Sequence, residues 1–175
     1  PEPQIVYVLV NVMTEINRDM YEPSSKPINL TLVIDQSYSM LGTGIEQAKL
    51  FGIKLVDELT ETDIFSLISI NEEATLLTSP AANIVKGEMK DRISRITAFG
   101  ATELSSGLSL ALQQNSLFHH KPFNNIIVLV TDGNTFEDHN VCIELGKQAF
   151  EDNITLVLAT AGTEANDTFL VKLNP

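Results

Sequence analysis

PINLTLVIDQSYSML, residues 27–41, carries the strongest fold signal of the chain. Leu30–Ile34 form an unbroken run of apolar and β-branched residues, which is typical of a strand buried on both faces. Asp35 ends this run, and Ser37 and Ser39 follow at alternate positions. In open parallel α/β sheets, ligands bind beyond the carboxyl ends of the strands. The stretch therefore predicts a central strand with polar side chains where a site would form.

Strands and helices alternate along the remaining chain, which predicts βα units around a mostly parallel sheet. Apolar runs predict strands at 28–35, 63–70, 74–78, 125–131 and 153–161. Helical periodicity predicts helices at 44–60, 83–96, 102–118, 138–151 and 167–173. The short polar connection before residue 74 predicts an antiparallel hairpin at the sheet edge, ended by Pro80. The expected fold class is α/β: a Rossmann-like, doubly wound, mostly parallel central sheet with one antiparallel edge strand and helices on both faces.

The first 27 residues are expected to flank the core domain. Residues 4–13, QIVYVLVNVM, predict a strand, and residues 14–27 have the composition of a surface loop. The core domain is then expected over residues 28–175, without its closing strand and helix. The chain begins with Pro1 and not with methionine, so a piece of a longer protein is expected.

Composition narrows the classes of partner. The formal net charge of −12 argues against nucleic acid and against anionic membrane surfaces, and it suits a cation or a basic partner. The single cysteine, Cys142, excludes an internal disulfide and a cysteine-based zinc site, and its helical context predicts a small buried hydrophobe. No apolar run approaches the roughly 18 residues of a membrane span.

Five oxygen-bearing residues are expected to converge at one edge of the sheet. Two predicted strands end in Asp35 and Asp132, and Thr102 follows a glycine-led loop at the start of a predicted helix. If the two strands are neighbours, their ends lie about 5 Å apart. With Ser37 and Ser39, these residues offer only hard oxygen ligands, which suit Mg²⁺. The sequence therefore predicts a magnesium site, with Mn²⁺ or Ca²⁺ as alternatives.

The order Asp35-x-Ser37-x-Ser39, then Thr102, then Asp132-Gly133 resembles the metal ion-dependent adhesion site (MIDAS) of von Willebrand factor type A domains of bacterial or archaeal type. The resemblance covers roughly residues 28–173. It implies a divalent-cation-dependent protein-interaction module and no enzyme activity. The implied partner is a protein that offers an Asp or Glu to the metal.

The resemblance also implies a role for each site residue. Ser37 and Ser39 would bind the metal directly, and Thr102 would do so in the ligand-competent state. Asp35 and Asp132 would act mainly through water. Residues 100–102 read Gly-Ala-Thr where the family commonly has Gly-Gly-Thr, and Tyr38 stands where bacterial members often have glycine. Neither departure removes a ligand oxygen, so both bear on partner affinity more than on metal binding.

Two enzyme-like hypotheses compete with this interpretation. A phosphatase or phosphotransferase of the haloacid-dehalogenase type also places an aspartate at a strand end, but it needs a second aspartate where this chain has Ser37. A nucleotide-binding Rossmann protein would carry a GxGxxG or a GxxxxGK[ST] motif after the first strand, and this chain has neither. The resemblance favours a cytoplasmic scaffold, with a cell-surface or secreted protein as the alternative.

Overall fold

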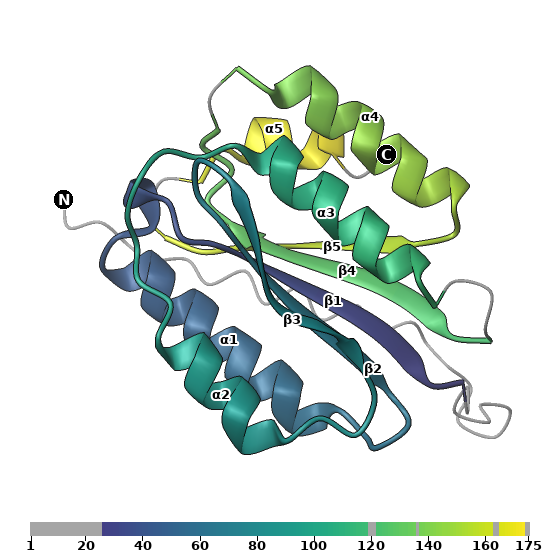
Figure 1. Cartoon of the computed structure of the whole chain (residues 1–175). Coiled ribbons are helices and arrows are strands. Elements are labelled where there is room, and N and C mark those ends of the chain that lie inside the picture. Colours follow the sequence, from purple (N-terminus) through teal and green to yellow (C-terminus); the bar gives the residue numbers. More distant parts are fainter. Residues whose placement is uncertain (1–25, 119–121, 136, 163–164, 174–175) are drawn as a thin grey trace, which may run out of the picture.

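A computed structural model describes residues 26–118, 122–135, 137–162 and 165–173. These residues form a five-stranded sheet in the order β3-β2-β1-β4-β5, with helices on both faces (Figure 1). The strands are β1 (Ile28–Asp35), β2 (Ile64–Ile70), β3 (Ala74–Ala81), β4 (Asn124–Thr131) and β5 (Thr155–Thr160). The helices are η1 (Tyr38–Met40), α1 (Thr43–Glu58), α2 (Lys86–Ser94), α3 (Leu104–Ser116), α4 (His139–Glu151) and α5 (Asp167–Leu173).

The pairing of the strands confirms the predicted fold class. β1 pairs in parallel with β2 and with β4, and β4 pairs in parallel with β5. β3 runs antiparallel to β2, as the predicted hairpin requires. β1 is therefore the central strand, which explains why its sequence is apolar without alternation.

Two apolar layers hold the helices against the sheet. On one face, Leu32 and Ile34 of β1 pack in a cluster with residues of α1 and α2. On the other face, Val33 packs in a second cluster with residues of α3, α4 and α5. All three side chains have no exposed surface. The successive residues of β1 thus anchor both layers, because side chains alternate across a strand.

The strands that follow β1 in the sequence are added first on one side of β1 and then on its other side. The α1 connection leads from β1 to β2, and α3 leads back across the sheet to β4, the opposite neighbour of β1. The strand order therefore reverses between β1 and β4. This is the position at which an open α/β sheet leaves a crevice for ligands beyond its carboxyl edge.

Some boundaries differ from the sequence prediction. β3 continues through Pro80 to Ala81, so the prediction that Pro80 ends this strand was wrong. Proline lacks a backbone donor but is tolerated on edge strands, and β3 is an edge of the described sheet. α2 starts only at Lys86 and not at the predicted residue 83, so Val85 lies outside the helix, where it is exposed. The predicted strand at 4–13 lies outside the described residues.

Cys142 is buried in α4 within the core, as its helical context predicted. Burial raises the pKa of its thiol well above the ordinary value, and the carboxylate of Asp138 adds to this shift. The thiol therefore stays protonated, and the Cys142 side chain contributes to the packing of the core. In the described part of the chain, none of the helices combines the length and the apolar character needed to span a membrane.

Candidate functional site

The five predicted site residues lie at the carboxyl edge of β1 and β4. Asp35 is the last residue of β1, and Asp132 directly follows β4. Both carboxylates are buried, as are Ser37 and Thr102, whereas Ser39 is exposed. Parallel pairing of β1 with β4 places the two strand ends side by side. The structure therefore brings residues from three distant segments to one edge of the sheet.

Asp35 organises the base of the site. Its Oδ1 accepts a hydrogen bond from the backbone N–H of Ser37 at 2.8 Å, and its Oδ2 accepts one from the Thr131 hydroxyl at 2.6 Å. Burial raises the pKa of the Asp35 carboxyl above its ordinary value; the hydrogen bonds from Thr131 and Ser37 oppose this shift, and the charge of Asp132 reinforces it. A cation bound near these two carboxylates would stabilise their buried negative charge.

The two serine hydroxyls lie next to each other above Asp35. Ser37 Oγ and Ser39 Oγ are 3.1 Å apart. The short η1 turn follows Ser37, and the N–H of Met40 donates to the carbonyl of Ser37 at 3.0 Å. This tight turn brings the alternate hydroxyls together, while the buried Met40 side chain anchors it in the core.

The Thr102 loop is fastened to the segment that carries the serines. The N–H of Phe99 donates to the carbonyl of Gln36 at 2.7 Å, and the N–H of Tyr38 donates to the carbonyl of Gly100 at 2.9 Å. Gly100 has φ +77°, a conformation that side-chain-bearing residues rarely adopt. α3 begins at Leu104, so Thr102 lies two residues before the helix and not at its predicted first position.

The site opens into a shallow hollow of about 280 Å³. Its lining residues are Ser37, Tyr38, Ser39, Gly100, Ala101, Thr102, Asn134 and Thr135. Asp132 lies beneath this lining: its Oδ1 accepts a hydrogen bond from the N–H of Asn134 at 2.9 Å. The hollow is thus rich in hydroxyl groups, and the carboxylates of Asp35 and Asp132 lie below them.

Three residues that the sequence interpretation missed support the site. Thr131 holds Asp35, as described above. Thr135 Oγ1 lies 2.5 Å from Asp138 Oδ1 and 3.2 Å from the carbonyl oxygen of Thr102. Asp138 Oδ2 accepts a hydrogen bond from the N–H of Ser105 at 2.7 Å, so the loop after β4 holds the start of α3. Thr131 follows Val130, which pairs with Ile34 in the parallel register, so its contact with Asp35 could be found only once β4 was placed beside β1.

Replacing Asp35 with asparagine should stabilise the metal-free protein. A carboxyl whose pKa is raised by folding binds its proton more tightly in the folded state, so its charged form disfavours folding above the unfolded pKa. Asparagine removes that charge and keeps groups that can bond Ser37 and Thr131. We expect Asp35→Asn to raise Tm in EDTA by a few degrees, the shift that about 1 kcal/mol produces in a domain of this size.

Differential scanning fluorimetry in EDTA at pH 7 tests this expectation. The difference in Tm between Asp35→Asn and the native protein should become smaller as pH falls, because protonation of Asp35 removes the same buried charge. A lower Tm of Asp35→Asn at pH 7 would show instead that the hydrogen bonds of the carboxylate outweigh its burial.

The donor set fits a small divalent cation. Within the described residues there is no group of three or more His, Cys, Asp or Glu side chains that could hold a metal. A metal here would therefore depend on hydroxyl oxygens, which Ser37, Ser39 and Thr102 supply around the hollow. Hard oxygen donors of this kind suit Mg²⁺ or Mn²⁺ and not soft metals.

Comparison with known proteins gives a family match over most of the chain. The family model of the von Willebrand factor type A domain matches residues 29–174. An uncharacterized protein of Synechocystis sp. is 28% identical over 144 residues, which make up 82% of this chain and 34% of that protein. The chain thus spans about a third of the length of this relative.

Two solved structures share the fold. Proximal thread matrix protein 1 from the mussel byssus, with a zinc-occupied MIDAS motif, has a TM-score of 0.73 at 19% identity and is matched over 85% of this chain and 39% of its own. Manganese-loaded TRAP protein of Plasmodium vivax has a TM-score of 0.70 at 18% identity, over 82% of this chain and 61% of its own. At such identities the likeness shows the fold alone, and the metals are properties of those two proteins.

Proposed function

Because the chain belongs to the von Willebrand factor type A family, we propose that its site takes a divalent cation and thereby captures an acidic residue of a protein partner. Domains of this family are generally interaction modules and not enzymes. A role as a protein-interaction module follows from membership of this family. The bound metal, the residues that hold it and the acidic residue of the partner are what we propose beyond this.

The observation that carries this proposal is the pair of serine hydroxyls above a buried carboxylate. Ser37 and Ser39 offer two neutral oxygens 3.1 Å apart, and Asp35 beneath them supplies charge. In the proposal, both serines and Thr102 hold the cation directly, while Asp35 and Asp132 act through water. Three neutral ligands leave the cation electrophilic, so when bound it supplies an open position for one further carboxylate. Mg²⁺ is the proposed ion.

The chain's own contacts favour a preformed site. The Thr102 loop is bonded to the serine segment by two backbone hydrogen bonds of 2.7 and 2.9 Å. Thr135 and Asp138 hold the start of α3 from the other side. Few side chains then need to be ordered on binding, which favours affinity. The exposed position of Ser39 leaves the hollow accessible to a partner.

Thermal melting with Mg²⁺ and with EDTA tests the proposal. Mg²⁺ at about 100 times its Kd should stabilise the native protein by about 2.7 kcal/mol, which corresponds to a rise in Tm of roughly 5–10 °C. The double variant Ser37→Ala/Ser39→Ala should lose this rise, because both direct ligands are gone. Ser109→Ala changes an exposed serine of α3 and serves as the matched control. Superimposable melting curves of the native protein in Mg²⁺, Mn²⁺ and EDTA would refute the metal site.

A further inference from the structure

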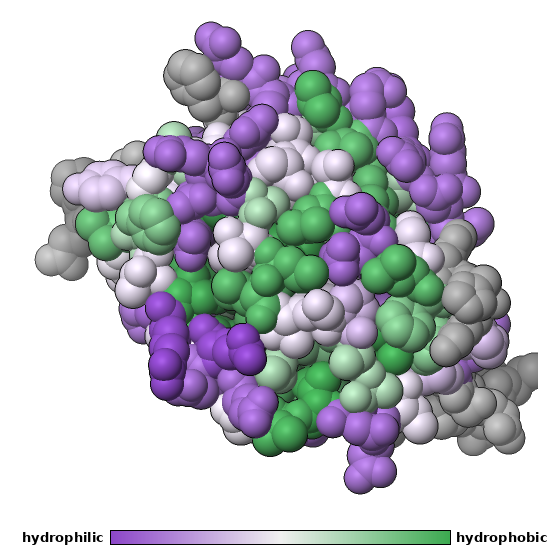
Figure 2. Space-filling view, viewed as in Figure 1, coloured by the Kyte–Doolittle hydropathy of each residue, from purple (hydrophilic) through white to green (hydrophobic). Residues whose placement is uncertain are grey.

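Large apolar side chains are exposed beside the candidate site. Tyr38, Leu41 and Phe99 keep 68%, 57% and 53% of their surface exposed. Tyr38 also lines the hollow, and the N–H of Leu41 donates to its carbonyl at 3.0 Å. Figure 2 shows pale purple, white and green areas side by side at the left edge of the molecule, where Figure 1 draws the short turn η1. Exposed apolar residues that gather in one place mark interaction sites.

The backbone holds this apolar rim, formed by Tyr38, Leu41 and Phe99, in a fixed arrangement. Phe99 and Tyr38 each donate a hydrogen bond across the two segments, to Gln36 and to Gly100. The rim residues therefore belong to the same short segments that carry Ser37, Ser39 and Thr102. A partner that reached the hollow with one side chain would meet the apolar rim with its neighbours.

An acidic group lies next to the Thr102 loop, outside the lining of the hollow. It consists of Glu72, Glu73 and Glu103, on the turn between β2 and β3 and directly before α3, and all three are exposed. Glu72 Oε1 accepts a hydrogen bond from the N–H of Ala101 at 3.4 Å, and the N–H of Glu103 donates to the carbonyl of Asn71 at 2.8 Å. The turn and the Thr102 loop are therefore in contact.

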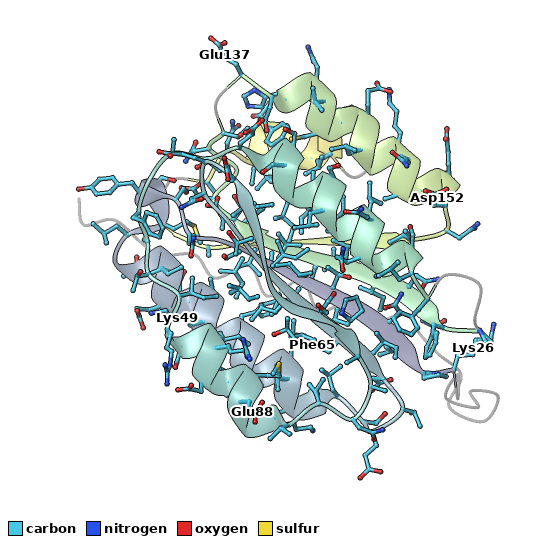
Figure 3. The ribbon with its side chains drawn as sticks, in the orientation of Figure 1. Lys26, Lys49, Phe65, Glu88, Glu137 and Asp152 are labelled. Carbon is cyan, nitrogen blue, oxygen red and sulfur yellow. The ribbon has the colours of Figure 1, made fainter. Side chains whose placement is uncertain are left out.

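No basic side chain neutralises this acidic group among the residues that the structure describes. The described ion pairs join Lys49 to Glu46, Lys90 to Asp57, Arg95 to Asp91 and Lys147 to Glu144. The labelled Lys49 lies on α1, away from the turn between β2 and β3 (Figure 3). Three uncompensated carboxylates in a chain of net charge −12 attract a basic partner.

We propose that the partner of this site is a protein segment whose acidic residue is flanked by a large apolar residue and by a lysine or arginine. The acidic residue enters the hollow, the apolar residue packs on the rim of Tyr38, Leu41 and Phe99, and the basic residue faces Glu72, Glu73 and Glu103. The inference rests on the proposed metal-dependent function and adds the chemistry of the partner. An acidic residue without such neighbours would meet an apolar surface on one side and like charge on the other.

A displayed peptide library tests this inference with the whole chain. The library carries one fixed aspartate with randomised residues on both sides, and it is selected in Mg²⁺ and in parallel in EDTA. We expect Mg²⁺-dependent enrichment of peptides with an aromatic or aliphatic residue and a lysine or arginine within a few positions of the aspartate. For a selected peptide, Leu41→Ser/Phe99→Ser should weaken Kd about tenfold in fluorescence polarisation.

Matched variants separate the contribution of the apolar rim from that of the acidic group. Glu72→Gln/Glu103→Gln should weaken binding of peptides with a basic flank and leave peptides with only an apolar flank almost unaffected. Phe150→Ser changes an exposed aromatic residue of α4 and should leave Kd unchanged. Mg²⁺-dependent enrichment of the aspartate with random flanks would overturn this inference and leave the proposed function in place. Absence of any Mg²⁺-dependent enrichment, together with a missing Mg²⁺ shift in Tm, would overturn both.

Discussion

Replacing Asp63 with alanine should lower the free energy of unfolding by about 3 kcal/mol, because three hydrogen bonds to one carboxylate are lost. Asp63 Oδ1 accepts from the N–H of Ile28 at 2.7 Å, and Oδ2 accepts from the N–H and the hydroxyl of Thr60 at 2.7 and 2.8 Å. The side chain thus joins the start of β1 to the loop that follows α1. Only 6% of Asp63 is exposed and Ile28 is half-buried, so alanine would leave the N–H of Ile28 without its partner, whereas water can reach the donors of the exposed Thr60.

Urea unfolding at pH 7 measures this loss, and its pH dependence identifies the cause. Burial raises the pKa of Asp63, but the hydrogen bonds from Ile28 and Thr60 outweigh it and lower the pKa below the ordinary value. A carboxyl with a lowered folded pKa stabilises the protein above its unfolded pKa of about 3.9 and loses this effect as pH falls through the folded pKa. The difference between native protein and Asp63→Ala should therefore shrink below about pH 4. A difference that stayed constant down to pH 2 would attribute the effect to packing.

Gly107→Ala should destabilise the protein by about 2–3 kcal/mol, the cost of an extra methyl group in a filled core. A Cβ at Gly107 would lie 2.0 Å from Cδ1 and 2.5 Å from Cγ1 of Ile70, a fully buried residue at the end of β2. Either the side chain of Ile70 or α3, together with the loop that carries Thr102, would have to move. We therefore expect a lower Tm in EDTA and also a smaller rise in Tm on addition of Mg²⁺.

Gly87→Ala provides the matched control for this variant. Gly87 also lies within a helix, α2, but a Cβ there would meet nothing within 4 Å. Alanine should then stabilise the helix by about 0.5–1 kcal/mol, because glycine loses more backbone entropy on folding. Chemical denaturation of both variants gives the comparison. Destabilisation by both substitutions would show that backbone effects, and not the contact with Ile70, dominate at Gly107.

Much of the fold could be predicted because β1 has an unusual sequence. A strand buried on both faces favours apolar or β-branched residues at nearly every position, and few segments other than Leu30–Ile34 and Ile126–Val130 meet this condition. The boundaries were less predictable. Pro80 was expected to end a strand, but an edge strand tolerates a missing donor, and whether a strand lies at an edge depends on the whole sheet.

The residues of the candidate site were predictable by type, but their support was not. Asp35, Ser37 and Asp132 stand where strands end, so their position follows from local pattern. The supporting contacts join segments far apart in the chain: Thr131 to Asp35 and Asp138 to Ser105. Such contacts depend on which strands become neighbours, and a single sequence does not encode that order in any local pattern.

By itself, the sequence of residues 27–41 determined a buried strand that ends in a carboxylate and two hydroxyls, because apolar runs and polar breaks are local properties. Only the tertiary structure decided that β4 lies beside β1, and hence that Thr131 holds Asp35 and Asp132 lies close enough to raise its pKa. It also decided that Tyr38 lines the hollow and that Leu41 and Phe99, on the adjoining segments, stay exposed. Electrostatic interaction and exposure depend on distance in space, and the chain sets that distance only when it folds.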